Sequence, residues 1–266
     1  MTTERLAKEY GKGETWTISH GDCIEGMRTL ADGSVDVTIT DPPYEAEAHT
    51  KGRRMKVANG VSSTGRYNGW AEAPLPFAAI TDDERDASAL ELARVTKRWV
   101  LVFCQVEASA KWAASLVAGG LEYIRTMVWI KPDGQPQFTG DRPGVGYESI
   151  VVAHRCGRKR WNGGGRTGVF EFNKFEGSKL AGKSPHPTTK PRLLMRELVS
   201  LFSDPGEIIL DPFAGSGSTG VACGQLGRRF LGWEINQEYF DIACRRLNGE
   251  EAKPNHAQPS LFGGVA

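Results

Sequence analysis

The amino-acid sequence predicts an α/β fold, a doubly wound and mostly parallel sheet with helices on both faces. Runs of β-favouring residues alternate with runs of helical length along nearly the whole chain, which is the rhythm of a parallel sheet. One strand-like run, Trp99–Cys104, is apolar at every position, as expected of a strand covered on both faces. A chain of 266 residues with 39% hydrophobic content can bury the core of one sizeable domain.

The expected elements follow from local residue patterns. Val35, Val37 and Ile39 alternate with polar residues, which predicts a half-buried strand, and the other strands show similar β-favouring runs. We expect strands at Thr15–Ser19, Val35–Thr40, Trp99–Cys104, Tyr123–Ile130, Ser149–His154, Glu207–Asp211 and Arg229–Glu234. We expect helices at Cys23–Leu30, Asp82–Lys97, from Glu107 onward, at Pro191–Phe202, after Gly217 and at Gln237–Leu247.

We interpret residues 1–252 as one domain. Two irregular stretches, near 45–80 and 133–185, are expected to be insertions at the edge of the sheet, and residues 253–266 a disordered tail. The N-terminus is polar and charged, unlike a signal peptide, and no apolar run approaches membrane-spanning length, so we expect a cytoplasmic protein without a membrane partner. The five cysteines show no CxxC spacing, which predicts neither a metal site nor a disulfide framework.

Basic residues gather in two glycine-rich segments without acids, although the formal net charge is only +1. The first segment lies between Ala48 and Ala71, and the second between His154 and Phe170. Tyr67, Trp70 and Trp161 add aromatic faces to them, and the combination favours contact with nucleic-acid phosphates. The candidate contact residues are Lys51, Arg53, Arg54, Lys56, Arg66, Arg158, Lys159 and Arg160.

The strand at Val35–Thr40 is followed by Asp41, Pro42, Pro43 and Tyr44. Two successive prolines cannot donate backbone hydrogen bonds, so they leave a rigid segment whose carbonyls face outward as acceptors only. Asp41 adds a carboxylate and Tyr44 an aromatic face. Together they suit a flat group that carries an NH2, such as a nucleobase.

A second motif, residues 209–220, predicts a strand, a glycine-rich turn and the start of a helix. Gly215, Gly217 and Gly220 spell GxGxxG, and Glu234 ends the next expected strand. Such glycines let the backbone approach a ligand, and such an acid binds ribose hydroxyls, so the motif indicates an adenosine-containing cofactor. A nicotinamide enzyme would need further strands after this motif, but few residues follow Gly220. The missing strands must therefore precede it.

With "DPPY" at 41–44, "DPFAGSGST" at 211–219 and "HPTTKP" at 186–191, the chain resembles the amino-group DNA methyltransferases that use S-adenosylmethionine. The order of the motifs resembles the permuted beta group of that family, which implies a Rossmann-like, circularly permuted class I methyltransferase fold. The resemblance implies that catalysis involves Asp41, Pro42, Pro43 and Tyr44. It implies that the cofactor is bound by Asp22, Cys23, Thr188, Lys190, Asp211, Phe213, Ala214, Gly215, Ser216, Gly217 and Glu234.

Asp41 favours the 6-amino group of adenine in double-stranded DNA, on a base rotated out of the duplex. The alternative is the 4-amino group of cytosine, whose enzymes more often have serine at this position. An NAD-dependent oxidoreductase and a catalytically silent DNA-binding module remain more distant alternatives. The resemblance also implies a homodimer, and Gln258, Leu261 and Phe262 resemble the short peptides that dock on the replication sliding clamp.

Overall fold

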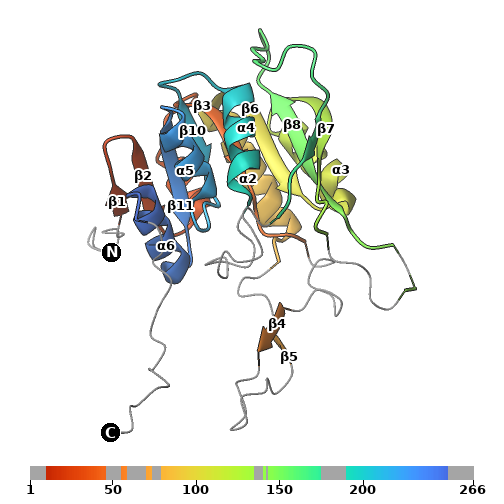
Figure 1. Ribbon diagram of the computed structural model, residues 1–266. Coiled ribbons are helices and arrows are strands. Elements are labelled where there is room, and N and C mark those ends of the chain that lie inside the picture. The colour runs from red at the N-terminus through yellow and green to blue at the C-terminus, as the bar shows by residue number, and fades with distance from the viewer. Residues whose placement is uncertain are drawn as a thin grey trace, which may run out of the picture.

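The computed structural model describes residues 10–45, 55–58, 70–73, 79–134, 140–141, 143–174 and 190–250. Within these residues a nine-stranded sheet has the order β1-β2-β11-β10-β3-β6-β8-β7-β9 (Figure 1). Its strands are β1 (Tyr10–Lys12), β2 (Trp16–His20), β3 (Val35–Thr40), β6 (Thr96–Cys104), β7 (Glu122–Ile130), β8 (Tyr147–His154), β9 (Val169–Glu171), β10 (Ile208–Asp211) and β11 (Arg229–Glu234). A separate antiparallel pair consists of β4 (Met55–Ala58) and β5 (Trp70–Ala73).

The centre of the sheet is parallel. Strands β2, β11, β10, β3 and β6 are neighbours and run in one direction. Strand β8 runs antiparallel between β6 and β7, and β1 runs antiparallel to β2. The prediction of a mostly parallel α/β sheet is therefore confirmed.

Helices cover both faces of the sheet. They are α1 (Cys23–Arg28), α2 (Asp82–Val95), α3 (Ser109–Ala118), α4 (Arg192–Phe202), α5 (Ser218–Gln225) and α6 (Gln237–Leu247), with a short 3-10 turn, η4 (Val106–Ala108), before α3. One hydrophobic core contains residues of α4, α5 and α6, and the other contains residues of α1, α2 and α3. Alternate residues of β6 enter the two cores: Leu101 and Phe103 the first, Val100 and Val102 the second. This explains why the strand is apolar throughout.

Helix ends follow local capping chemistry. Thr81 and Glu84 form a capping box at the start of α2, and the Asn236 side chain accepts a hydrogen bond from Tyr239 N at the start of α6. Helix α2 ends at Val95, two residues before the predicted end, because β6 begins at Thr96. The expected helix from Glu107 is divided into η4 and α3.

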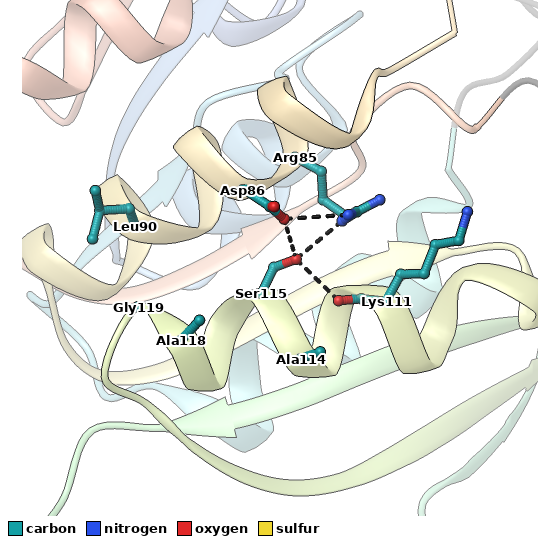
Figure 2. Close-up of a pocket in the computed structure, with 8 residues that line it drawn as sticks. All are labelled: Arg85, Asp86, Leu90, Lys111, Ala114, Ser115, Ala118 and Gly119. Carbon is teal, nitrogen blue, oxygen red and sulfur yellow. Dashed lines mark hydrogen bonds and ion pairs between the residues drawn. The ribbon is translucent and has the colours of Figure 1, made fainter.

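Helices α2 and α3 pack together through a polar contact (Figure 2). The Arg85 guanidinium donates to Ser115 Oγ at 3.0 Å and pairs with Asp82 and Asp86, while Ser115 Oγ donates to Asp86 at 2.5 Å. Lys111 lines the surface pocket beside this contact. The pocket contains none of the residues predicted to bind a base or a cofactor.

Some features could not be anticipated from the sequence pattern. Strands β1, β4, β5 and β9 were not expected. The strand expected at Ser149–His154 is β8, and its place inside the sheet was not expected, because it lies within the stretch interpreted as an insertion near 133–185. Across the described ranges, no helix is long and apolar enough to span a membrane. Those ranges also contain no cluster of metal-ligating side chains.

Candidate active site

Strands β3 and β10 lie side by side at the point where the strand order reverses. From β10 the chain continues to β11 on one side, whereas β3 is followed in the sheet by β6 on the other. In open α/β sheets, ligands bind outside the carboxyl ends of the strands at such a switch point. Asp41 directly follows β3 and Asp211 is the last residue of β10, so the two sequence motifs meet there.

A hydrogen bond links the two motifs. Thr40 Oγ1 donates to Asp211 Oδ1 at 2.7 Å, and Thr219 Oγ1 donates to Asp211 Oδ2 at 2.6 Å. The backbone N–H of Phe213 also donates to Oδ1, at 3.2 Å. Burial raises the pKa of Asp211 to about 6, and these hydrogen bonds oppose the rise. The carboxylate therefore fixes the start of the cofactor loop, the segment Phe213–Gly217.

The cofactor loop has the backbone shape that its glycines predict. Gly215 and Gly217 have φ of +52° and +79°, in the left-handed region, and Gly217 caps α5. A Cβ at Gly215 would meet nothing within 4 Å, whereas one at Gly217 would lie 3.2 Å from Ala243 Cβ. Gly215 thus borders open space that a ligand can enter, and Gly217 is needed for close packing against α6.

Residues outside the cofactor loop form hydrogen bonds with its central residues, Ala214 and Ser216. Ala214 N donates to Trp233 O at 2.8 Å, and Ser216, 4% exposed, is bound from α6. Arg246 Nη1 donates to Ser216 O at 2.5 Å and to Ser216 Oγ at 2.7 Å. Arg246 was not among the predicted site residues, because nothing in its local sequence distinguishes it from other surface arginines of a helix.

Glu234 ends β11 beside the loop. Its carboxylate accepts from Gly215 N at 2.8 Å and from Asn236 N at 2.7 Å, and burial raises its pKa. Each carboxylate oxygen retains acceptor capacity for a ribose hydroxyl. Next to it, Ile235 exposes 69% of its surface. An acceptor, an open glycine and an apolar surface therefore lie together, which fits an adenosine group.

The predicted residues Asp22 and Cys23 also lie near the end of β11. Gly21 N donates to Glu234 O at 2.9 Å, which brings the start of α1 next to the end of β11. Asp22 caps the helix by accepting from Glu25 N at 2.9 Å. Cys23 is buried, and burial, with smaller contributions from Asp22 and Glu234, raises the pKa of its thiol to about 12. Cys23 is therefore a packed, unreactive thiol.

The base loop consists of residues Asp41–Tyr44, directly after the end of β3. Pro42 is buried, and Asp41 Oδ2 pairs with the ammonium of Lys190. Asp41 Oδ1 is buried and has no hydrogen-bond partner among the described residues. Burial raises the pKa of Asp41, Lys190 lowers it and Glu148 raises it further. A buried carboxylate oxygen without a partner, in a group whose pKa is raised, suits the binding of an N–H group.

Lys190 was assigned to the cofactor site by resemblance, and its contacts in the structure are with acidic side chains. Its ammonium lies between Asp41 and Glu148, 3.4 Å from Glu148 Oε2, and Glu148 in turn pairs with Lys131. Glu148 and Lys131 were not predicted. An acid at the start of the otherwise apolar run of β8 was the one local signal.

The described DNA candidates lie away from the base loop. Strand β8 ends at His154, which pairs with Trp99 near the start of β6. The segment after β8 therefore lies at the amino ends of the parallel strands, whereas Asp41 lies at the carboxyl end of β3. There Lys159 pairs with Glu122 at 2.7 Å and Arg160 pairs with Asp204. Arg158 lies in the same segment. Their contact with DNA stays a prediction.

Other predicted residues lie outside the described residues. They are Lys51, Arg53, Arg54, Arg66, Thr188, Gln258, Leu261 and Phe262. Lys56 belongs to β4, but its side chain is not part of the description.

The strand order and the two motif loops define a class I methyltransferase fold. Within that class, the chain belongs to the DNA methylase family of N6 and N4 amino-methyltransferases, which it matches over residues 35–245. The matched residues contain both motif loops. The family therefore favours a DNA methyltransferase over the two alternatives, an NAD-dependent oxidoreductase and a catalytically silent DNA-binding module. The order of the loops in the chain, base loop before cofactor loop, is the order in which β3 and β10 occur.

Individual relatives agree with this assignment. The chain is 27% identical to the type II methyltransferase M.HinfI of Haemophilus influenzae over 256 residues, which cover 90% of this chain and 69% of that protein. The crystal structure of M1.HpyAVI complexed with SAM is 25% identical with a TM-score of 0.63, covering 88% of this chain and 99% of the other. The cytosine-N4-specific PvuII DNA methyltransferase has a TM-score of 0.65 at 15% identity, covering 91% and 98% of the two chains, which shows a shared fold alone.

Proposed function

We propose that this protein transfers a methyl group from S-adenosylmethionine to the 6-amino group of adenine in double-stranded DNA, at a specific site, with the target base rotated out of the duplex. The observation that carries the proposal is Asp41. Asp41 Oδ1 is buried and has no hydrogen-bond partner among the described residues, and Asp41 follows β3 at the switch point. Thr40, the residue before it, is hydrogen-bonded to Asp211, which ends β10 just before the cofactor loop.

The cofactor, when bound, supplies an electrophilic methyl group on a sulfonium. Glu234 would hold the ribose, and the cofactor loop would hold the methionine part beside Asp211. Gly215 leaves the room that such a ligand needs, because no atom lies within 4 Å of its absent Cβ. The sulfonium end would then be next to Asp41.

Asp41 and Pro42 act on the amino group of the base. The nitrogen is a poor nucleophile because its lone pair is conjugated with the ring. Hydrogen bonds from its two N–H groups to Asp41 Oδ1 and the Pro42 carbonyl favour a tetrahedral nitrogen, whose lone pair then points at the methyl carbon. The cofactor would supply the methyl carbon for the new N–C bond and keep the electron pair of the broken C–S bond on its sulfur, and Asp41 would take the proton released from the nitrogen. Tyr44 stacks on the extruded base, a contact typically of about 1–3 kcal/mol.

Adenine is proposed over cytosine because the residue before the prolines is Asp41, where the cytosine-N4 enzymes more often have serine. The two products are separable after enzymatic digestion of methylated duplex DNA to nucleosides. The proposal predicts N6-methyladenine, and N4-methylcytosine as the sole product would replace it with the alternative.

We propose further that residues 45–80 and 133–185 contribute DNA contacts and sequence specificity in a cytoplasmic homodimer of the beta group. Substitution of Arg53, Arg54 and Lys56 by alanine should weaken DNA binding and flatten its dependence on salt, because fewer phosphates would be neutralised. An unchanged salt slope would contradict phosphate contact. Light scattering tests the dimer, and a monomer at working concentration would refute it.

The tail proposal is separate. A peptide of residues 253–266 should bind the replication sliding clamp through Gln258, Leu261 and Phe262, with modest affinity because the segment must order on binding. The control peptide carries Leu261→Ala and Phe262→Ala. Equal binding by the two peptides, or none by either, would end this proposal.

A further inference from the structure

Four charged side chains form a row of alternating sign next to the proposed base site. In order they are Lys131 after β7, Glu148 in β8, Lys190 before α4 and Asp41 after β3. Lys131 pairs with Glu148, Lys190 lies 3.4 Å from Glu148 Oε2, and Lys190 pairs with Asp41. The side chains of Lys131, Glu148 and Lys190 are only 10–12% exposed. Four different segments of the chain therefore meet in one compact ionic network.

Lys190 is shared between two carboxylates. Its Nζ also lies 5.1 Å from the centre of the Phe103 ring, so an aromatic face closes another side of the ammonium. A buried cation without Glu148 would be compensated by Asp41 alone. The negative charge of Glu148 therefore offsets part of the positive charge that Lys190 presents to Asp41.

We propose that Glu148 is a positioning residue for the methyl transfer: its negative charge offsets that of Lys190, so that Asp41, paired with Lys190 through Oδ2, remains basic enough to take the proton of an amino group bound at Oδ1. Lys131 balances the charge of Glu148. The inference rests on the proposed function, in which Asp41 is the proton acceptor.

The charges that face the two carboxylates support different roles for them. Burial raises the pKa of Glu148, but Lys190 and Lys131 outweigh it and lower the pKa to about 2. Glu148 therefore stays ionised. The pKa of Asp41 is raised, chiefly by burial, so Asp41 is the carboxylate that accepts a proton. The titratable groups whose charges act on or respond to Asp41 are Lys190, Glu148, Lys131, Tyr44, Cys104 and Asp211.

The test uses three variants, Glu148→Gln, Lys131→Met and the two combined. Single-turnover methyl transfer to duplex DNA is measured between pH 4.5 and 8.5 with saturating enzyme and cofactor, so that product release does not limit the rate. In parallel, calorimetry with S-adenosylhomocysteine measures cofactor affinity, and thermal unfolding reports folding.

The two single variants should shift the acid limb of the pH profile in opposite directions. Glu148→Gln removes a negative charge, so the charge of Lys190 is compensated by Asp41 alone and the pKa of Asp41 falls. The acid limb therefore moves to lower pH. The plateau rate falls as well, because Asp41 becomes a weaker base. Lys131→Met removes a positive charge, so the limb moves to higher pH. Burial lowers the pKa of Lys131, and its ion pair with Glu148 opposes that change. The combined variant should return close to the wild-type limb, with cofactor affinity unchanged in all three.

A purely structural role would lower rates without opposite shifts. If the wild type transfers methyl groups but the acid limbs of folded single variants coincide with its own, the role of Glu148 is refuted while the proposed function stands. If the wild type transfers no methyl group to DNA, the proposed function and this inference fall together.

Discussion

The Thr40 hydroxyl donates a hydrogen bond to Asp211 Oδ1 at 2.7 Å, and this contact joins two motifs that are 171 residues apart in the chain. Thr40 directly precedes the proposed catalytic carboxylate, and Asp211 ends β10 just before the cofactor loop. The base site and the cofactor site are thus held in one frame by a buried side-chain contact between adjacent parallel strands, at the point where the strand order reverses.

Thr40→Val should weaken cofactor binding. The change leaves one hydrogen bond of Asp211 unmade, a loss of about 1–3 kcal/mol, so affinity for S-adenosylhomocysteine should fall roughly tenfold by calorimetry. The matched control is Thr38→Val on the same strand, because Thr38 Oγ1 bonds Thr96 Oγ1 at 2.7 Å and touches no part of the site. Equal losses of cofactor affinity in both variants would show that the contact acts on stability alone.

Asp211→Asn should change how stability depends on pH. The pKa of Asp211 is about 6 in the folded protein and 3.8 ordinarily, so the folded state holds its proton more tightly. The free energy of unfolding should therefore decrease by about 2 kcal/mol as pH rises from about 4 to about 6, and this part of the dependence should vanish in the asparagine variant. Urea unfolding at pH 4, 5, 6 and 7 measures it. Parallel pH curves for the two proteins would contradict the raised pKa.

Gly215→Ala should abolish or strongly reduce cofactor binding, because the added methyl group enters the open space that the ligand needs. The left-handed backbone adds a strain of about 1–2 kcal/mol. Gly227→Ala is the control for strain, since Gly227 has φ of +68° and also has nothing within 4 Å of its absent Cβ, but lies in the turn after α5. Normal binding of S-adenosylhomocysteine by Gly215→Ala would place the cofactor elsewhere.

Arg246→Met should loosen the cofactor loop from α6. It removes two hydrogen bonds to Ser216, so cofactor affinity should fall while the response of transfer rate to DNA concentration stays the same. Arg245→Met removes an equal charge from the neighbouring exposed position and should change neither quantity. The idea fails if the two variants bind S-adenosylhomocysteine alike.

The parts that could be predicted from the sequence are those set by local chemistry. Proline ends β3 after Asp41, and glycine permits the left-handed turn at Gly215, so both motif loops were located from their residue types. The network of Lys131 and Glu148 could not be predicted, because it depends on β8 lying antiparallel between β6 and β7. The three-residue strands β1 and β9 were not predicted for a similar reason. They are defined by pairing with longer neighbouring strands and not by a local residue pattern.

The position of the second basic segment was also set by this topology. Because β8 runs antiparallel to β6, Lys159 and Arg160 lie at the end of the strands opposite to Asp41, where they pair with acidic residues. A linear pattern of basic residues carries no information on which edge of a sheet it will occupy.

The most direct test of the central claim is the product formed by the wild type and by Asp41→Ala on unmodified duplex DNA with labelled S-adenosylmethionine. Digestion to nucleosides followed by mass spectrometry should show N6-methyladenine for the wild type and no methylated base for Asp41→Ala, although the variant binds S-adenosylhomocysteine with nearly wild-type affinity. Wild-type turnover by Asp41→Ala, or a methyl group on any atom other than the adenine amino nitrogen, would contradict the account.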